Sequence, residues 1–252
     1  MLTERALRRA LERVGLDAPV RFDEVTRSTQ ETASALAAEG APEWTLVGTG
    51  HQTAGRGRLG RSWHDVPGRA LMLSIVLRPD LDPGRGGLLT LLAGWAMAAA
   101  GRDRGHDIGC KWPNDLMVGG GKAGGIIADS VVVGDRFDHV VLGIGVNIGE
   151  APADVAGASS LDEPDPAGLL EAFLGHLVHR YEPGHPAFAG GVLDGYRDVC
   201  VTLGRTVRVL TIEGGLGPEG EAIDVDDVGA LVIRTADGLF AVRSGEVEHL
   251  CV

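Results

Sequence analysis

Two lysines stand close together in a chain that otherwise draws its positive charge from arginine. Of the 23 lysines and arginines, only Lys111 and Lys122 are lysines, and they bracket the segment KWPNDLMVGGGK. Lysine carries a compact ammonium whose pKa can shift, whereas arginine carries a fixed planar guanidinium, so one does not simply replace the other. Codon bias could have removed the other lysines, but chance alone would scatter the survivors. The pairing therefore indicates a function that needs lysine.

The segment between the two lysines also contains a carboxylate. Pro113 restricts the backbone, and Asn114 and Asp115 favour a turn, which holds Lys111 at the end of a strand. A carboxylate near a lysine can orient the ammonium, bind Mg²⁺ or accept a proton from an attacking amine. Asp115 is therefore a candidate catalytic residue.

A second segment, GTGHQTAGRGRLGRSW, alternates arginines with glycines. Its glycines satisfy G-x-G-x-x-G, but loop and strand residues follow instead of the helix that a dinucleotide site requires. Three guanidinium groups on a flexible backbone suit a polyanion such as a triphosphate, and Trp63 could stack on a purine. A solvated basic loop beside a core tryptophan is the alternative. The arginines are Arg56, Arg58 and Arg61.

Composition limits the classes of protein to consider. The net charge of −12, with no basic tail, disfavours nucleic acid as a partner. The longest apolar run, residues 88–101, is shorter than the ~20 residues that span a bilayer, so it predicts a buried helix and no membrane segment. Three cysteines far apart and without metal-ligand spacing predict a cytoplasmic protein.

The order of predicted elements indicates an α+β fold. Helical patterns occur at residues 3–14, 28–39, 87–101 and 167–181, among strands joined by glycine-rich turns, which favours a mixed or antiparallel sheet. After a connector at 182–198, four or five short β-branched segments predict a small antiparallel barrel. We therefore expect a catalytic domain at 1–197 and a small β-barrel domain at 198–252.

Five motifs, in this order and spacing, resemble biotin protein ligases. They are RSTQETA (27–33), GHQTAGRGRLGRSW (50–63), KWPNDL (111–116), KAGGIIAD (122–129) and GIGVNI (143–148). The match covers most of the first 195 residues, and SGEVEHL near the end resembles the family's small C-terminal domain. KWPND together with GRGRxGR is a specific signal.

The resemblance implies a reaction and its participants. Members of the family use ATP and Mg²⁺ to convert biotin into biotinyl-5′-AMP, and then transfer biotin to one lysine of a biotin carboxyl carrier domain. It also implies a class II synthetase-like catalytic domain, an SH3-like C-terminal barrel, and a monomer or homodimer. Only 27 residues precede Ser28, so the resemblance implies the monofunctional form without a DNA-binding domain.

The motif positions also assign roles to residues of this chain. Biotin would contact Ser28, Thr29, Gln30, Gln52, Gly55, Arg56, Gly57, Arg58, Lys122 and Gly125. The nucleotide would contact Arg58, Arg61, Trp63, Lys111, Asn114 and Asn147. The catalytic candidates are Lys122, Arg58, Asp115 and Lys111, and no metal ligand is assigned. The family usually reads Ser-Thr-Asn where this chain reads Ser-Thr-Gln, which places Gln30 in question.

Two other functions remain as alternatives. A lipoate or octanoate ligase would share the fold, although KWPND with GRGRxGR favours biotin. A non-catalytic biotin-binding or DNA-binding regulator would be expected to lack the catalytic lysine or to add a basic domain, and the sequence shows neither.

Overall fold

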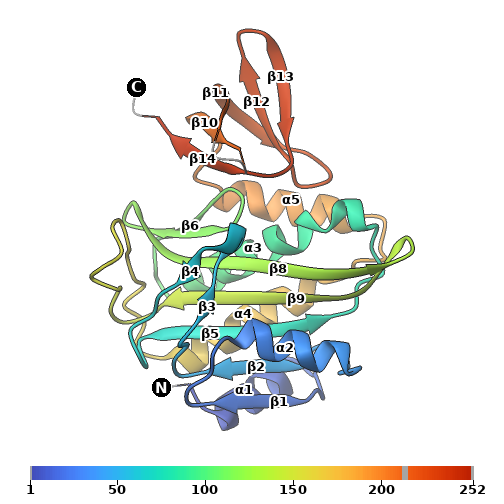
Figure 1. Cartoon of the computed structure of the whole chain (residues 1–252), viewed down its shortest axis with the longest axis vertical. Coiled ribbons are helices and arrows are strands. Elements are labelled where there is room, and N and C mark those ends of the chain that lie inside the picture. The colour runs from blue at the N-terminus through green and yellow to red at the C-terminus, as the bar shows by residue number, and fades with distance from the viewer. Residues whose placement is uncertain (1, 212–214, 251–252) are drawn as a thin grey trace.

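A seven-stranded sheet forms the main layer of the computed structural model, which describes residues 2–211 and 215–250 (Figure 1). The strands lie in the order β1-β2-β5-β9-β8-β7-β6. β1 and β2 are parallel, and the other neighbours pair antiparallel, as a mixed sheet was predicted to do. The strands are β1 (Val20–Asp23), β2 (Leu46–Thr49), β5 (Ala70–Leu77), β6 (Ile108–Lys111), β7 (Asp115–Val118), β8 (Gly121–Val133) and β9 (Arg136–Asn147).

Helices cover the two faces of this sheet unequally. α1 (Glu4–Arg13), α3 (Gly87–Asp103), α4 (Pro166–Arg180) and α5 (Phe188–Val199) share one large apolar core with the sheet. α2 (Thr29–Ala38) lies on the opposite face, over Val47, Val76 and Val141. Figure 1 shows α2 in front of the sheet and α3 and α4 behind it. The thin cover on the α2 side leaves room there for a site.

The four predicted helices are confirmed, whereas the predicted connector at 182–198 is wrong over most of its length. Residues 188–199 form α5. Gly190 and Gly191 lower its helix propensity, but Val192, Tyr196 and Val199 recur at helical spacing and are buried. Tertiary packing of this apolar face therefore overrides the local glycine signal.

The C-terminal strands form a second, antiparallel sheet at the top of Figure 1. Its order is β13-β12-β11-β10-β14, which confirms the predicted group of short strands. The strands are β10 (Thr206–Leu210), β11 (Leu216–Val225), β12 (Leu231–Thr235), β13 (Gly238–Val242) and β14 (Glu246–His249). Val207, Leu231 and Val247 join the main apolar core, so the two sheets pack as one body.

The run at 88–101 is a buried part of α3, as predicted. Across residues 2–211 and 215–250, no helix has both the length and the apolarity that a bilayer crossing requires. Cys110 and Cys200 are buried free thiols, and Cys251 lies outside the described residues.

A buried carboxylate anchors the segment between β9 and α4. Glu163 accepts hydrogen bonds from Arg104 at 2.7 and 2.9 Å, and its Oε2 lies 2.9 Å from His106 Nε2. The Arg104 guanidinium lowers the pKa of Glu163 to about 2. Residues 152–158 of the same segment cover part of the cavity described below, so Glu163 helps to hold that cover in place.

We predict that Glu163→Gln lowers the free energy of unfolding by about 3 kcal/mol at pH 7, because each unit of pKa shift is worth about 1.4 kcal/mol. A carboxylate with a lowered pKa stabilises the fold above its unfolded pKa and loses that effect as the pH falls through its folded pKa. The difference between wild type and variant should therefore shrink from pH 4.5 to about 2. Urea unfolding followed by circular dichroism at each pH measures it.

Glu171→Gln is the matched control. Glu171 is 3.9 Å from Arg13 and its side chain is 41% exposed, so its loss should change stability by less than about 1 kcal/mol. Equal losses in the two variants at pH 7 would contradict the assigned role of Glu163.

Candidate active site

A cavity of about 290 Å³ opens on the α2 face of the main sheet. Its walls come from the start of α2, from β5, β8 and β9, from residues 152–158, and from a two-stranded ribbon. That ribbon pairs β3 (Gly55–Arg56) with β4 (Ser62–Trp63) and carries the arginine segment across the sheet (Figure 1). The segment that the sequence marked as cationic is thus one wall of a cavity.

The floor of the cavity is bare backbone of β9. A side chain at Gly143 would collide with the Gln30 amide, and a Cβ at Gly145 would lie 2.9 Å from the Trp63 ring. Gly125 of β8 pairs with Gly145 and also lines the cavity. Glycine at these positions lets the walls approach the sheet closely.

The N-terminus of α2 supplies polar groups to the cavity. Ser28 occupies the N-cap position, but its side chain caps no backbone N–H. Its Oγ is buried and has no hydrogen-bond partner among the described residues. Instead, the Thr29 N–H donates to Gln52 Oε1 at 2.8 Å. A serine released from capping is free to bind a ligand.

Both the nitrogen and the oxygen of the Gln30 side-chain amide are hydrogen-bonded within the protein. Its Nε2 donates to the Val141 carbonyl at 2.8 Å, and its Oε1 accepts from Ser74 Oγ at 3.0 Å. The side chain lies against Gly143, where no Cβ opposes it. The longer amide is therefore accommodated as part of the cavity wall.

A β-bulge in β8 turns Lys122 toward the cavity. The β7–β8 register shifts between Leu116 and Met117, so Ala123 and Gly124 together occupy the space of one residue. Without this bulge, strand alternation would place Lys122 and Gly125 on opposite faces. With it, both line the cavity, and Lys122 Nζ lies 2.5 Å from Asp115 Oδ1.

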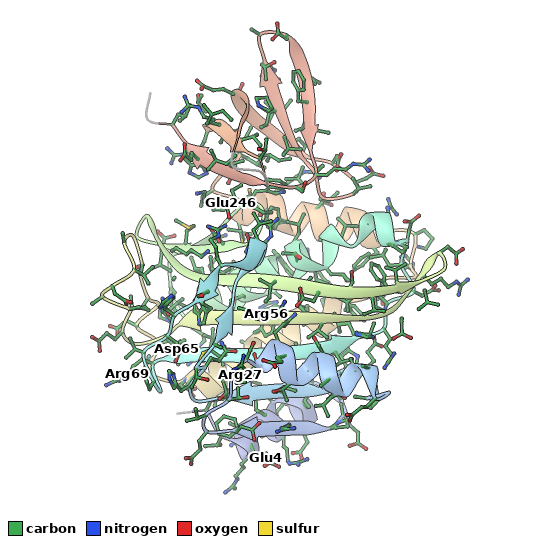
Figure 2. The ribbon with its side chains drawn as sticks, in the orientation of Figure 1. Glu4, Arg27, Arg56, Asp65, Arg69 and Glu246 are labelled. Carbon is green, nitrogen blue, oxygen red and sulfur yellow. The ribbon has the colours of Figure 1, made fainter. Side chains whose placement is uncertain are left out.

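Each arginine of the ribbon has a partner within the protein. Arg56 lies 3.5 Å from Asp129, and Arg58 donates to the Asn114 side chain at 3.2 Å. Arg61 forms an ion pair with Glu246 of the C-terminal sheet. The ribbon therefore links the cavity to that sheet, and Figure 2 shows Glu246 beside the end of the ribbon.

Burial lowers the pKa of Arg58, and the nearby Asp115 carboxylate opposes this shift. The cavity thus combines one partly buried guanidinium, one ammonium and one carboxylate. Such a set can bind a ligand with several negative charges and stabilise charge that develops on it.

Three buried polar atoms in the cavity lack a partner among the described residues. They are Ser28 Oγ, Trp63 Nε1 and Asn147 Oδ1. Asn147 is oriented by its own amide, since Nδ2 donates to the Ser159 carbonyl at 2.9 Å and leaves Oδ1 free. Buried polar groups without partners are rare, and all three of these belong to residues that line the cavity.

The structure brings most of the predicted site residues together, but two lie apart. Gly55 is in the ribbon but does not line the cavity. It pairs with Trp63, and a Cβ at position 55 would lie 2.6 Å from the Trp63 carbonyl oxygen. Lys111 lies at the end of β6, outside the cavity lining. Those that line it are Ser28, Thr29, Gln30, Gln52, Arg56, Gly57, Arg58, Arg61, Trp63, Asn114, Asp115, Lys122, Gly125 and Asn147.

Sequence reasoning missed three contributors. Ser74 was hidden in an apolar strand, although a single hydroxyl in ALMLSIVL was a usable signal. The cover at 152–158 includes Pro152 and Val155, which carry no chemical motif. Glu246 could not be linked to the arginine segment, because only the tertiary fold brings them together.

Two family models match separate parts of the chain, and curated relatives match most of it. Residues 22–147 match the Biotin/lipoate A/B protein ligase family, and residues 202–250 match the Biotin protein ligase C terminal domain. The Bifunctional ligase/repressor BirA of Bacillus subtilis is 32% identical over 98% of this chain and 79% of its own length. The Biotin--[acetyl-CoA-carboxylase] ligase of Mycobacterium tuberculosis is 35% identical over 89% of this chain and 86% of its own.

Solved structures also resemble the fold. A biotin protein ligase from Leishmania major in complex with biotinyl-5-AMP has a TM-score of 0.61 and 25% identity, over 93% of this chain and 99% of its own. A biotin protein ligase from Aquifex aeolicus in complex with biotin and ATP has a TM-score of 0.68 over 91% of this chain and 97% of its own. At 23% identity, the second likeness concerns the fold alone.

We predict that Glu246→Gln loosens the ribbon, because it removes the charge that holds Arg61. Trypsin should then cleave after Arg56, Arg58 or Arg61 about two- to fivefold faster, as expected for an ion pair worth up to about 1 kcal/mol. Mass spectrometry of timed digests locates and measures the cleavage. Glu219→Gln, which removes another ion pair of the same sheet, is the control. Equal rates in both variants would refute the role of Glu246.

Proposed function

Because this chain belongs to the Biotin/lipoate A/B protein ligase family, we propose that its cavity carries out ATP-dependent ligation of biotin to a carrier protein. The observation that carries this proposal is that Lys122 and Arg58 line one cavity together with Ser28, Trp63 and Asn147, each of which has a buried polar atom without a partner among the described residues. The match to a C-terminal domain named for biotin protein ligases favours biotin over lipoate or octanoate.

The first half-reaction joins a carboxylate to a nucleotide. A carboxylate oxygen of biotin attacks the α-phosphorus of ATP, the bond to the β-phosphate breaks, and pyrophosphate leaves. We assign the biotin head to the groups around Ser28, Thr29 and Gln52, and the nucleotide to those near Trp63 and Asn147. Lys122 and Arg58 would stabilise the negative charge that develops where the biotin carboxylate meets the α-phosphate.

The second half-reaction transfers the acyl group to an amine. The amine of an acceptor lysine attacks the biotinyl carbonyl, the bond to AMP breaks, and the amine loses a proton. Asp115 is the carboxylate of the cavity lining, and we assign it to hold the incoming ammonium or accept its proton. Its ion pair with Lys122 supports this, because both groups then face one reaction centre.

Mg²⁺ would have to displace cationic side chains to reach the protein oxygens here, because Asp115 pairs with Lys122 and Asn114 Oδ1 accepts from Arg58. Asp115 and Asn114 line the cavity side by side, and Mg²⁺ in nucleotide sites is commonly bound by one or two carboxylates together with substrate phosphates. Bound there, the ion would neutralise phosphate charge.

Further assignments remain part of the proposal. We propose a carboxylase carrier domain as the acceptor, which the name of the Mycobacterium tuberculosis relative supports. We propose a division at 1–197 and 198–252, with the second part an SH3-like barrel, because register shifts within β10–β11 and β11–β12 can curve that sheet. The predicted cytoplasmic location continues to rest on cysteine usage.

Exchange of labelled pyrophosphate into ATP tests the first half-reaction. We expect exchange that requires biotin and that lipoate or octanoate does not support. Exchange with lipoate instead would keep the chemistry and overturn the substrate. A folded protein that binds biotin and catalyses no exchange would support the alternative function of a non-catalytic biotin-binding regulator.

We predict that Lys122→Gln lowers biotin-dependent exchange roughly 10²- to 10³-fold, because the variant loses the ammonium nearest the reaction centre. Lys111→Gln tests the separate prediction that Lys111 also acts, although it lies outside the cavity lining. Circular dichroism confirms that both variants fold. Near-wild-type exchange by Lys122→Gln would remove Lys122 from the mechanism, and near-wild-type exchange by Lys111→Gln would remove Lys111.

A further inference from the structure

A buried carboxylate lies at the base of the ribbon, at the opposite end from Glu246 (Figure 2). The Asp65 side chain has no exposed surface. Its Oδ2 lies 2.8 Å from His51 Nδ1, and its Oδ1 accepts from the Gln52 N–H at 3.3 Å. These bonds join the chain just after the ribbon to the chain just before it. Because burying a carboxylate is costly, this one indicates a requirement for defined geometry.

The bonds of Asp65 lead directly to a cavity side chain. The Gln52 side chain accepts from the Thr29 N–H, and a backbone N–H can only donate, so the acceptor must be Oε1. One N–H of the Gln52 amide nitrogen donates to Met72 Sδ at 3.5 Å, which leaves its second N–H for the cavity, where Ser28 Oγ has no partner among the described residues. The orientation of Gln52 thus determines which hydrogen-bonding group the ligand meets.

His51 acts from outside the cavity. It lines a neighbouring groove with His64 and Asp154, and it is absent from the cavity lining. Its backbone carbonyl accepts from the Thr26 N–H at 3.0 Å, which fixes its main chain while Asp65 fixes its ring. The residue is therefore held at both ends and cannot itself touch a ligand in the cavity.

We propose that His51 and Asp65 form a positioning pair that fixes Gln52, so that its amide nitrogen donates to the polar head of the carboxylic acid substrate. The inference rests on the proposed function and adds two positioning residues to it. The pair sets the affinity for the acid and leaves the nucleotide positions near Asn147 unchanged.

Three histidine variants test the proposal. His51→Ala removes the partner of Asp65, whereas His51→Asn keeps an N–H at the position of Nδ1. His176→Ala is the matched control, since His176 is paired with Asp103 at 2.7 Å and is 29% exposed, against 31% for His51. The measurements are KM for biotin, KM for ATP and kcat in pyrophosphate exchange, calorimetric biotin binding without ATP, and the thermal midpoint.

We expect His51→Ala to raise KM and Kd for biotin about tenfold, the effect of losing a hydrogen bond to a charged group, while KM for ATP and kcat change less than about twofold. His51→Asn should recover most of that loss, and His176→Ala should behave as wild type. A lower thermal midpoint with unchanged KM for biotin would make the pair merely structural and overturn the proposal. Equal increases in both KM values, or no rescue by asparagine, would also overturn it.

Measurements on the wild-type enzyme separate a failure of the proposed function from a failure of the positioning role of His51 and Asp65. If it neither binds biotin nor exchanges pyrophosphate with it, the proposed function fails, and the positioning role fails with it. If it does both and His51→Ala is indistinguishable from wild type, only the positioning pair is refuted.

Discussion

Three glycines on one face of β8 and β9 are the constraint on which the site depends. Gly125, Gly143 and Gly145 leave backbone as the cavity floor, and the walls use the space that a Cβ would take. Gln30 packs on Gly143 and Trp63 packs on Gly145, so both side chains occupy space that a Cβ on the sheet would otherwise fill. A single alanine in either place would displace a wall of the cavity, although it would barely alter the strand itself.

Electrostatics adds a second constraint, because the cationic ribbon is balanced by the protein's own groups. Arg56 and Arg61 pair with carboxylates whose side chains are 44% and 30% exposed. Pairs this exposed contribute about 0–1 kcal/mol each, so an incoming phosphate can replace them at small cost. Arg58 differs, because its partial burial leaves its charge less screened by water. The ion pairs of Arg56 and Arg61 thus order the ribbon, but they are weak enough for both arginines to exchange a carboxylate for a phosphate.

The sequence was sufficient for the types of most elements and for most members of the site, for identifiable reasons. Helix α3 contains a long continuous apolar run, and motifs such as KWPND keep their chemistry within a few residues. The failures involve contacts between distant segments. Glu246 meets Arg61 only through the packing of the C-terminal sheet, and α5 is a helix because Tyr196 and Val192 are buried, despite its glycines. Local patterns carry no information about such partners.

A one-residue bulge in β8 decides which of the two lysines faces the cavity. From spacing alone, Asp115 belonged with Lys111, and the two are direct partners across the β6–β7 hairpin. The ion pair nevertheless forms with Lys122, because the bulge in β8 reverses the side on which that lysine projects. The Gly-Gly step after Ala123 was the available signal, since glycine inside a strand often marks a bulge. A regular β8 would keep both lysines and the same strand order, yet direct Lys122 into the core face, where a charge is unfavourable. Which lysine faces the cavity is therefore a property of strand register, which residue spacing alone does not reveal.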